Sequence, residues 1–148
     1  MSTENKTSIT LENIINAPVE KVWEYWTKPE HITQWSFASD DWHTPHAEND
    51  LRAGGKFSSR MEAKDGSMGF DFGGVNDVVT PNEYLEYTIG DGRKVKVYFK
   101  SDGDKTTVTE TFEAEDTNPV EMQKAGWQAL LDNFKKYAER LSRDSKAE

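Results

Sequence analysis

The chain has 148 residues, a net charge of −9 and no cysteine, and these properties exclude several classes of function. A nucleic-acid partner is not expected, because phosphate backbones bind clustered basic faces. Membrane insertion is not expected either, since no apolar run approaches the roughly 20 residues of a spanning helix. The absence of cysteine excludes disulfides, thiol nucleophiles and Cys-ligated metal centres.

The start of the chain, residues 1–8, is polar and lacks the apolar segment of a signal peptide. We therefore expect a flexible N-terminal tail and a cytoplasmic protein. Ile9 to Ile15 is the first strand expected from the pattern.

Two short helices should follow, each opened by a proline. Pro18 and Pro29 suit the first helical position, where a missing N–H costs no hydrogen bond. Pro29 also disfavours helical backbone at Lys28, so the first helix should end near Thr27. Helical spacing gives apolar faces, made by Val19, Val22, Trp23 and Trp26 in the first helix and by Ile32 and Trp35 in the second.

The middle of the chain changes to a two-residue alternation, which indicates antiparallel strands joined by short turns. The turn sequences include Lys64-Asp65-Gly66 and Gly90-Asp91-Gly92. The expected strands, paired as a meander, are Lys56 to Ala63, Met68 to Thr80, Tyr84 to Ile89, Lys94 to Lys100 and Thr106 to Ala114.

One long amphipathic helix is expected after Asn118-Pro119. Apolar or small residues recur there at helical spacing, namely Met122, Gly126, Trp127, Leu130, Leu131, Phe134, Tyr137, Ala138 and Leu141. Residues 143–148 should form a frayed C-terminal tail. Together these elements predict an α+β fold in which a helix packs on a curved sheet of about six or seven strands.

Four motifs resemble the family of the activator of heat shock protein 90 ATPase homologues. They are Ala17-Pro18-Val19-Glu20-Lys21-Val22-Trp23, Pro29-Glu30-His31 with Trp35, Asp50-Leu51-Arg52-Ala53-Gly54-Gly55-Lys56-Phe57, and Gly126-Trp127. That family belongs to the START-like, or birch-pollen-allergen-like (SRPBCC), superfamily. The resemblance implies a helix-grip fold, with residues 9–142 as a single START-like domain.

The resemblance also implies that part of the core is a cavity wall between the sheet and the last helix. Strand alternation and helical spacing select the candidate lining residues. They are Trp26, Trp35, Trp42, Phe57, Met61, Met68, Phe70, Phe72, Phe99, Glu110, Trp127, Leu130 and Phe134.

Glu110 is the one carboxylate in this set. It alternates with the apolar residues Val108 and Phe112, so it is expected on the inner face of the sheet. A carboxylate on the inner face would be neutralised by an upward pKa shift unless it had a partner. Glu110 is therefore a weak candidate for an acid, a base or a ligand-orienting group. A strand end or bulge that leaves it in water is the other reading.

The segment from Ser39 to His46 concentrates Asp40, Asp41, Trp42, His43 and His46. A polar connecting loop is expected there. His43 and His46 are a poor metal pair because the spacing fixes no third ligand. We expect no metal and no cofactor.

Three functions are left open by these residues. The first is a monomeric binding protein that holds an apolar or aromatic small molecule without chemistry of its own. The second, implied by the family resemblance alone, is a chaperone ATPase regulator or stress-response cofactor. The third is a cyclase-type or hydrolase-type enzyme that acts on a polyketide-like substrate through Glu110 or the segment around Asp40 and His43.

Overall fold

The computed structural model describes residues 8–37, 40–115 and 118–146. Most of the expected N-terminal tail, residues 1–7, lies outside this range, and Ser8 already belongs to the first strand. The elements in chain order are β1 (Ser8–Ile15), α1 (Val19–Thr27), α2 (Pro29–Trp35), β2 (Trp42–Asn49), β3 (Lys56–Ala63), β4 (Gly69–Thr80), β5 (Tyr84–Ile89), β6 (Lys94–Asp102), β7 (Lys105–Glu113) and α3 (Val120–Lys146).

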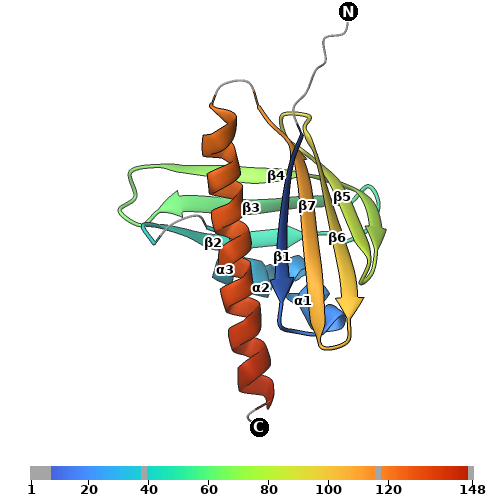
Figure 1. The fold of residues 1–148 in the computed structure, drawn as a ribbon. Helices are drawn as coiled ribbons and strands as arrows, with labels where there is room; N and C mark the ends of the chain where they lie inside the picture. The colour runs from blue at the N-terminus through green and yellow to red at the C-terminus, as the bar shows by residue number, and fades with distance from the viewer. Residues whose placement is uncertain (1–7, 38–39, 116–117, 147–148) are drawn as a thin grey trace, which may run out of the picture.

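All the strands form one seven-stranded antiparallel sheet in the order β1-β7-β6-β5-β4-β3-β2. The sheet curls, so that β2, β3 and β4 run nearly across the direction of β1, β7 and β6 (Figure 1). The long helix α3 lies against the concave side, and α1 and α2 close the lower end (Figure 1). The α+β helix-grip fold expected from the sequence is thereby confirmed.

The observed bounds of β3 and β5 coincide with those expected, whereas β2 was not expected. The segment assigned to a polar loop forms strand β2 from Trp42 onward. It pairs only with β3 and lies at the sheet edge, where a proline such as Pro45 is tolerated. At the other end of the chain, α3 continues to Lys146, beyond Ser142, where the sequence suggested a tail.

The core lies where the apolar faces of α1, the sheet and α3 meet. Val22 of α1, Val97 of β6, Val108 of β7 and Phe134 of α3 are all fully buried. The Trp26 ring contacts Phe134 with a centroid separation of 4.8 Å. These contacts fill the lower end of the space between helix and sheet.

Two glycines, one in the turn between β2 and β3 and one in β4, occupy backbone positions that do not suit a side chain. Gly54 has a φ of +84°, a conformation that L side chains rarely adopt. At Gly74 a Cβ atom would lie 2.0 Å from the Thr88 carbonyl oxygen, so the β4 and β5 backbones approach too closely for a side chain. The register between β4 and β5 shifts next to this point, between Asn76 and Val78.

Within the described part of the chain, no helix is long and apolar enough to cross a membrane.

Candidate functional site

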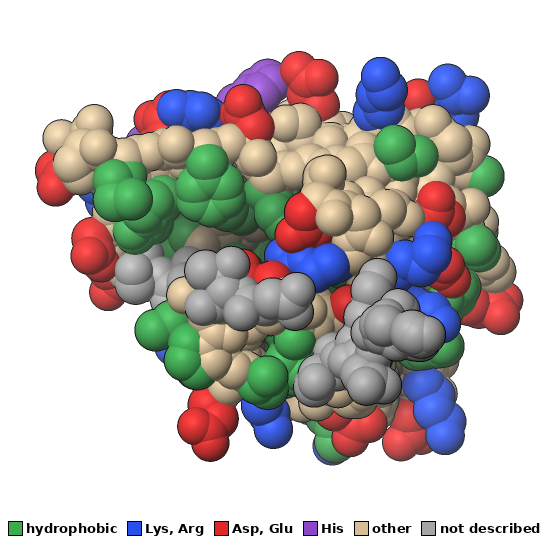
Figure 2. All heavy atoms as spheres, turned by 90° about the horizontal axis from the view of Figure 1, so that it is seen from above, with side chains coloured by type: hydrophobic (Ala, Val, Ile, Leu, Met, Phe, Trp, Pro, Cys, Tyr) green, Lys and Arg blue, Asp and Glu red, His purple; other side chains and the backbone are tan. Residues whose placement is uncertain are grey.

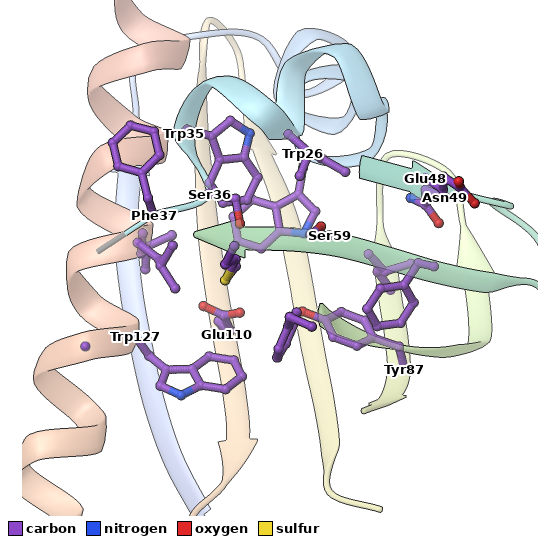
Figure 3. Close-up of a pocket in the computed structure, with 18 of the residues that line it drawn as sticks. Trp26, Trp35, Ser36, Phe37, Glu48, Asn49, Ser59, Tyr87, Glu110 and Trp127 are labelled. Atoms are coloured by element: carbon purple, nitrogen blue, oxygen red, sulfur yellow. The ribbon is translucent and has the colours of Figure 1, made fainter. Parts of the chain in front are cut away.

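A pocket of about 460 Å³ lies between the concave face of the sheet and α3. Figure 3 shows side chains from α1, α2, the strands and α3 directed into the same space. The lining residues are Trp26, Ile32, Trp35, Ser36, Phe37, Trp42, Glu48, Asn49, Phe57, Ser59, Met61, Phe70, Phe72, Asn76, Leu85, Tyr87, Arg93, Glu110, Gly126, Trp127, Leu130 and Leu131. Pockets of this size accommodate drug-sized molecules.

The floor of the pocket is an aromatic cluster from the two short helices. The rings of Trp26 and Trp35 lie 5.0 Å apart between centroids. The Trp35 indole N–H donates a hydrogen bond to the Tyr25 carbonyl oxygen at 2.9 Å, which fixes that ring. The two indoles therefore form the floor of the pocket where the apolar faces of α1 and α2 meet.

Aromatic residues of the sheet and of α3 form the walls above this floor. Phe57 of β3 lies edge-on to Tyr87 of β5, with 5.0 Å between the ring centroids. Phe72 of β4 lies edge-on to Trp127 of α3, at 6.3 Å. The helix and the strands therefore contribute rings to one continuous surface.

The outer end of the pocket is less covered. Phe70 contacts Trp42 with ring centroids 5.9 Å apart, and 48% of its surface is exposed. Figure 2 shows hydrophobic side chains gathered on the left of the face seen from above, the side where Figure 1 places the β3–β4 hairpin. Hydrophobic surface is therefore exposed at this end of the pocket.

Glu110 is the one carboxylate deep in the pocket, among the described lining residues, and only 5% of it is exposed. Its neighbours across the sheet are the buried residues Leu11 of β1 and Val97 of β6. Burial raises the pKa of Glu110 to about 8, because an apolar surrounding disfavours the charged carboxylate. Among the described residues, none forms a hydrogen bond or an ion pair with its carboxyl group.

The Tyr87 hydroxyl points into the same space from the opposite side (Figure 3). Its pKa is raised well above the usual value by burial, with a further contribution from the negative charge of Glu110. The Tyr87 side chain therefore remains a protonated phenol, a hydrogen-bonding group that faces the carboxyl group of Glu110.

Two further charged side chains line the pocket, and both already have partners. The Arg93 Nε donates to Asp91 Oδ2 at 2.8 Å, and its Nη1 donates to the Glu113 carbonyl oxygen at 3.0 Å. Glu48 lies 2.9 Å from His46 Nε2 and is largely exposed. Neither group compensates the carboxyl group of Glu110.

Most of the residues selected from the sequence line this pocket. They are Trp26, Trp35, Trp42, Phe57, Met61, Phe70, Phe72, Glu110, Trp127 and Leu130.

Three of the selected residues lie elsewhere. Phe99 and Phe134 pack behind Trp26 and are almost fully buried in the core. Met68 precedes β4 and is 65% exposed. Alternation for Phe99 and helical spacing for Phe134 predicted inward faces correctly but could not tell core from pocket. For Met68 the expectation was wrong, because β4 begins one residue later, at Gly69.

Several lining residues were missed, and most are polar. Tyr87 could have been found, because it alternates with the buried residues Leu85 and Ile89 on β5. Asn76 had no such signal: its amide donates at 3.0 Å to Asn49 Oδ1 and to the Asp50 carbonyl oxygen, contacts that only the folded chain creates.

The histidines of β2 do not come together as a metal site. His43 lies 3.8 Å from Glu62, and His46 binds Glu48. Within the described ranges no group of three or more His, Asp or Glu side chains is arranged to hold a metal ion. Ser39, at the start of the segment singled out in the sequence, lies outside the described residues.

Solved structures with the same architecture include several bacterial proteins. An AHSA1-like protein from Aeromonas hydrophila is 44% identical, with a TM-score of 0.87 over 91% of this chain and 94% of that chain. A protein from Cytophaga hutchinsonii is 56% identical, with a TM-score of 0.78 over 90% and 92% of the two chains. A Nitrosomonas europaea protein shares the fold at 20% identity, with a TM-score of 0.79 over 90% of this chain and 94% of that one.

No curated protein matches the chain. The model of the family described as "Activator of Hsp90 ATPase homolog 1-like protein" matches residues 16–139 and so spans α1 through most of α3. The chain belongs to this family, within the START-like superfamily.

Proposed function

We propose that this protein is a small cytoplasmic binding protein that holds an apolar or aromatic molecule in the pocket between the sheet and α3. The pocket itself carries the proposal: about 460 Å³ of space lined mainly by aromatic and aliphatic side chains, with few polar groups. Sites for small organic ligands have this composition, because burial of apolar ligand surface supplies affinity and isolated polar groups supply orientation.

Gly126 offers a sharp test of the pocket. It lies on the face of α3 that lines the pocket, and a Cβ atom added there would meet nothing within 4 Å. A leucine at this position therefore has room for its Cβ atom, and its longer side chain is expected to occupy part of the cavity that Gly126 lines. The substitution also replaces a helical glycine, which favours the helix by about 0.5 to 1 kcal/mol.

The experiment measures binding of the neutral fluorescent probe N-phenyl-1-naphthylamine, whose emission rises in apolar sites. We expect the wild-type protein to bind the probe and Gly126→Leu to lose most of that affinity. Ala125→Leu is the matched control, because Ala125 is exposed on the same helix and its substitution should preserve binding. No binding to the wild type, or equal binding to Gly126→Leu, would refute the proposal.

A second candidate function is regulation of a chaperone ATPase. It is favoured by the family match over residues 16–139, since the family is described as homologous to an activator of the Hsp90 ATPase. A pull-down with the chaperone and an ATPase assay test it, and the absence of both binding and stimulation would exclude it. The binding function is preferred because it uses the pocket, which the chaperone function leaves unexplained.

We further propose that the protein is a monomer. Size-exclusion chromatography with light scattering tests this directly against the calculated mass of 16.9 kDa.

A further inference from the structure

We propose that the occupant of the pocket is a cation with an apolar body, such as an aromatic or alicyclic amine, whose ammonium group pairs with the Glu110 carboxylate. This inference rests on the proposed binding function and specifies the chemical class of the ligand.

The Glu110 carboxyl group is isolated from other polar side chains of the described residues. It lies in the interior, 5% exposed, and has no hydrogen-bond or ion-pair partner among the described residues. A buried carboxyl group without a partner is costly to keep, because the desolvation of its charged form is not repaid. A cationic ligand group would provide the missing partner.

The charged side chains that line the pocket favour a cationic ligand over an anionic one. Among the described lining residues, the groups that carry charge or titrate are Glu110, Glu48, Arg93 and Tyr87. Arg93 is the one cation of this set, and Asp91 already pairs with it. The lining residues of α1, α2, β3, β4 and α3 carry no charge. An anionic ligand would therefore find no unpaired cation among these lining residues, so fatty-acid-like ligands are disfavoured.

Aromatic rings surround the space beside the Glu110 carboxyl group. Trp26, Trp127 and Tyr87 surround the space beside Glu110, as Figure 3 shows. The faces of aromatic rings carry negative electrostatic potential and attract ammonium groups, most strongly for tryptophan. The rings would also cover the apolar body of the ligand. A carboxylate among indole and phenol rings is thus suited to an amine rather than to a neutral hydrocarbon.

The proposal predicts a proton balance that can be measured. Because burial keeps the proton on Glu110 at pH 6.5, an incoming ammonium ion displaces it. The carboxylic acid loses a proton to the solvent, and the resulting carboxylate pairs with the ligand's ammonium group. Close to one proton should be released per bound cation, whereas a neutral ligand should release none.

The experiment compares three probes that share an indole ring: tryptamine, neutral 3-propylindole and anionic indole-3-propionate. Their affinities are measured by displacement of N-phenyl-1-naphthylamine. Proton release is measured by isothermal titration calorimetry at pH 6.5 in two buffers with different ionisation enthalpies. We expect the order tryptamine, 3-propylindole, indole-3-propionate, with proton release for tryptamine alone.

The variant Glu110→Gln keeps the shape of the side chain but cannot become charged. It should weaken tryptamine binding by about tenfold or more, as expected for loss of a charge-assisted contact, and abolish proton release. The preference for tryptamine over 3-propylindole should therefore fall in Glu110→Gln, and this ratio of affinities is the readout that tests the charge. The control Glu20→Gln removes an exposed carboxylate of α1 and should leave all three affinities unchanged.

Two kinds of failure are distinguishable. If the fluorescent probe does not bind, the proposed binding function fails and this inference fails with it. The other failure is that the fluorescent probe binds but tryptamine binds no better than 3-propylindole, or binds without proton release. In that case the proposed binding function is retained, and the inference that the ligand is a cation is wrong.

Discussion

The indole of Trp127 stacks on the ring of Phe112, with centroids 4.0 Å apart and an angle of 9° between the planes. This contact holds the N-terminal third of α3 on β7, the strand that also carries Glu110. Trp127 therefore has two roles: it holds the helix on the sheet, and it forms part of the pocket wall.

Replacement of Trp127 by alanine should affect both roles. We expect Trp127→Ala to lower the free energy of unfolding by about 2 to 4 kcal/mol, because the stacked contact and the buried indole surface are lost. Urea denaturation followed by circular dichroism measures the change. Lys124→Ala, at an exposed position of the same helix, is the control and should change stability by less than about 0.5 kcal/mol. A loss no greater than that of the control would contradict the anchoring role.

The pH dependence of stability should report on Glu110. Burial raises its pKa from the ordinary value of 4.5 to about 8. Between these values the folded protein keeps a proton that the unfolded chain releases, so stability is full at low pH and falls as pH rises through this window. The slope contributed by one such group is about 1.4 kcal/mol per pH unit at most.

Glu110→Gln should remove this contribution and flatten the stability profile between about pH 5 and pH 8. It should also make the protein more stable than the wild type at pH 8, because no charge has to be buried. Urea midpoints measured across this pH range provide the comparison, with Glu20→Gln as an exposed control. Parallel profiles for the wild type and Glu110→Gln would show that Glu110 is solvated or paired.

The buried Asn76 and the partly buried Asn49 should couple two strands that line the pocket. The Asn76 side chain donates to Asn49 Oδ1 at 3.0 Å, and Asn49 Nδ2 donates to the Thr27 carbonyl oxygen at 2.9 Å. The pair links β4, β2 and the end of α1. Asn76→Ala should cost about 1 to 3 kcal/mol, because it leaves buried polar partners unsatisfied.

A double-mutant cycle separates this coupling from simple loss of packing. The effects of Asn49→Ala and Asn76→Ala on the free energy of unfolding should be non-additive by about 0.5 kcal/mol or more. Additive effects would show that the two side chains act independently.

The sequence predicted the fold well because its signals are local. Pro29 is the first residue of α2 as expected, whereas Pro18 precedes the first residue of α1, Val19, and has an extended backbone. Turn residues separate strands with clear alternation, so the bounds of β3 and β5 agree with expectation. Strand β2 was missed because its residues do not alternate and it contains Pro45. At an edge, pairing with β3 alone is sufficient to hold such a segment as a strand.

The pocket was harder to predict than the fold, for a physical reason. Alternation shows which side of the sheet a residue faces but not where along the curved sheet it lies. Phe99 and Phe70 both face inward, yet Phe99 packs in the core and Phe70 lies at the exposed end of the pocket. Polar lining residues such as Asn76 and Arg93 depend on partners that are distant in sequence, so no local pattern marks them.

The five tryptophans allow the most direct test that the pocket binds a ligand. Trp26, Trp35, Trp42 and Trp127 line the pocket, whereas Trp23 packs on Phe99 in the core and is absent from the lining. The measurement is a titration with N-phenyl-1-naphthylamine, followed through the indole N–H resonances in ¹⁵N-labelled protein. The account predicts shifts for the tryptophans that line the pocket, with little change for Trp23. No shifts, or shifts of similar size at Trp23, would contradict it.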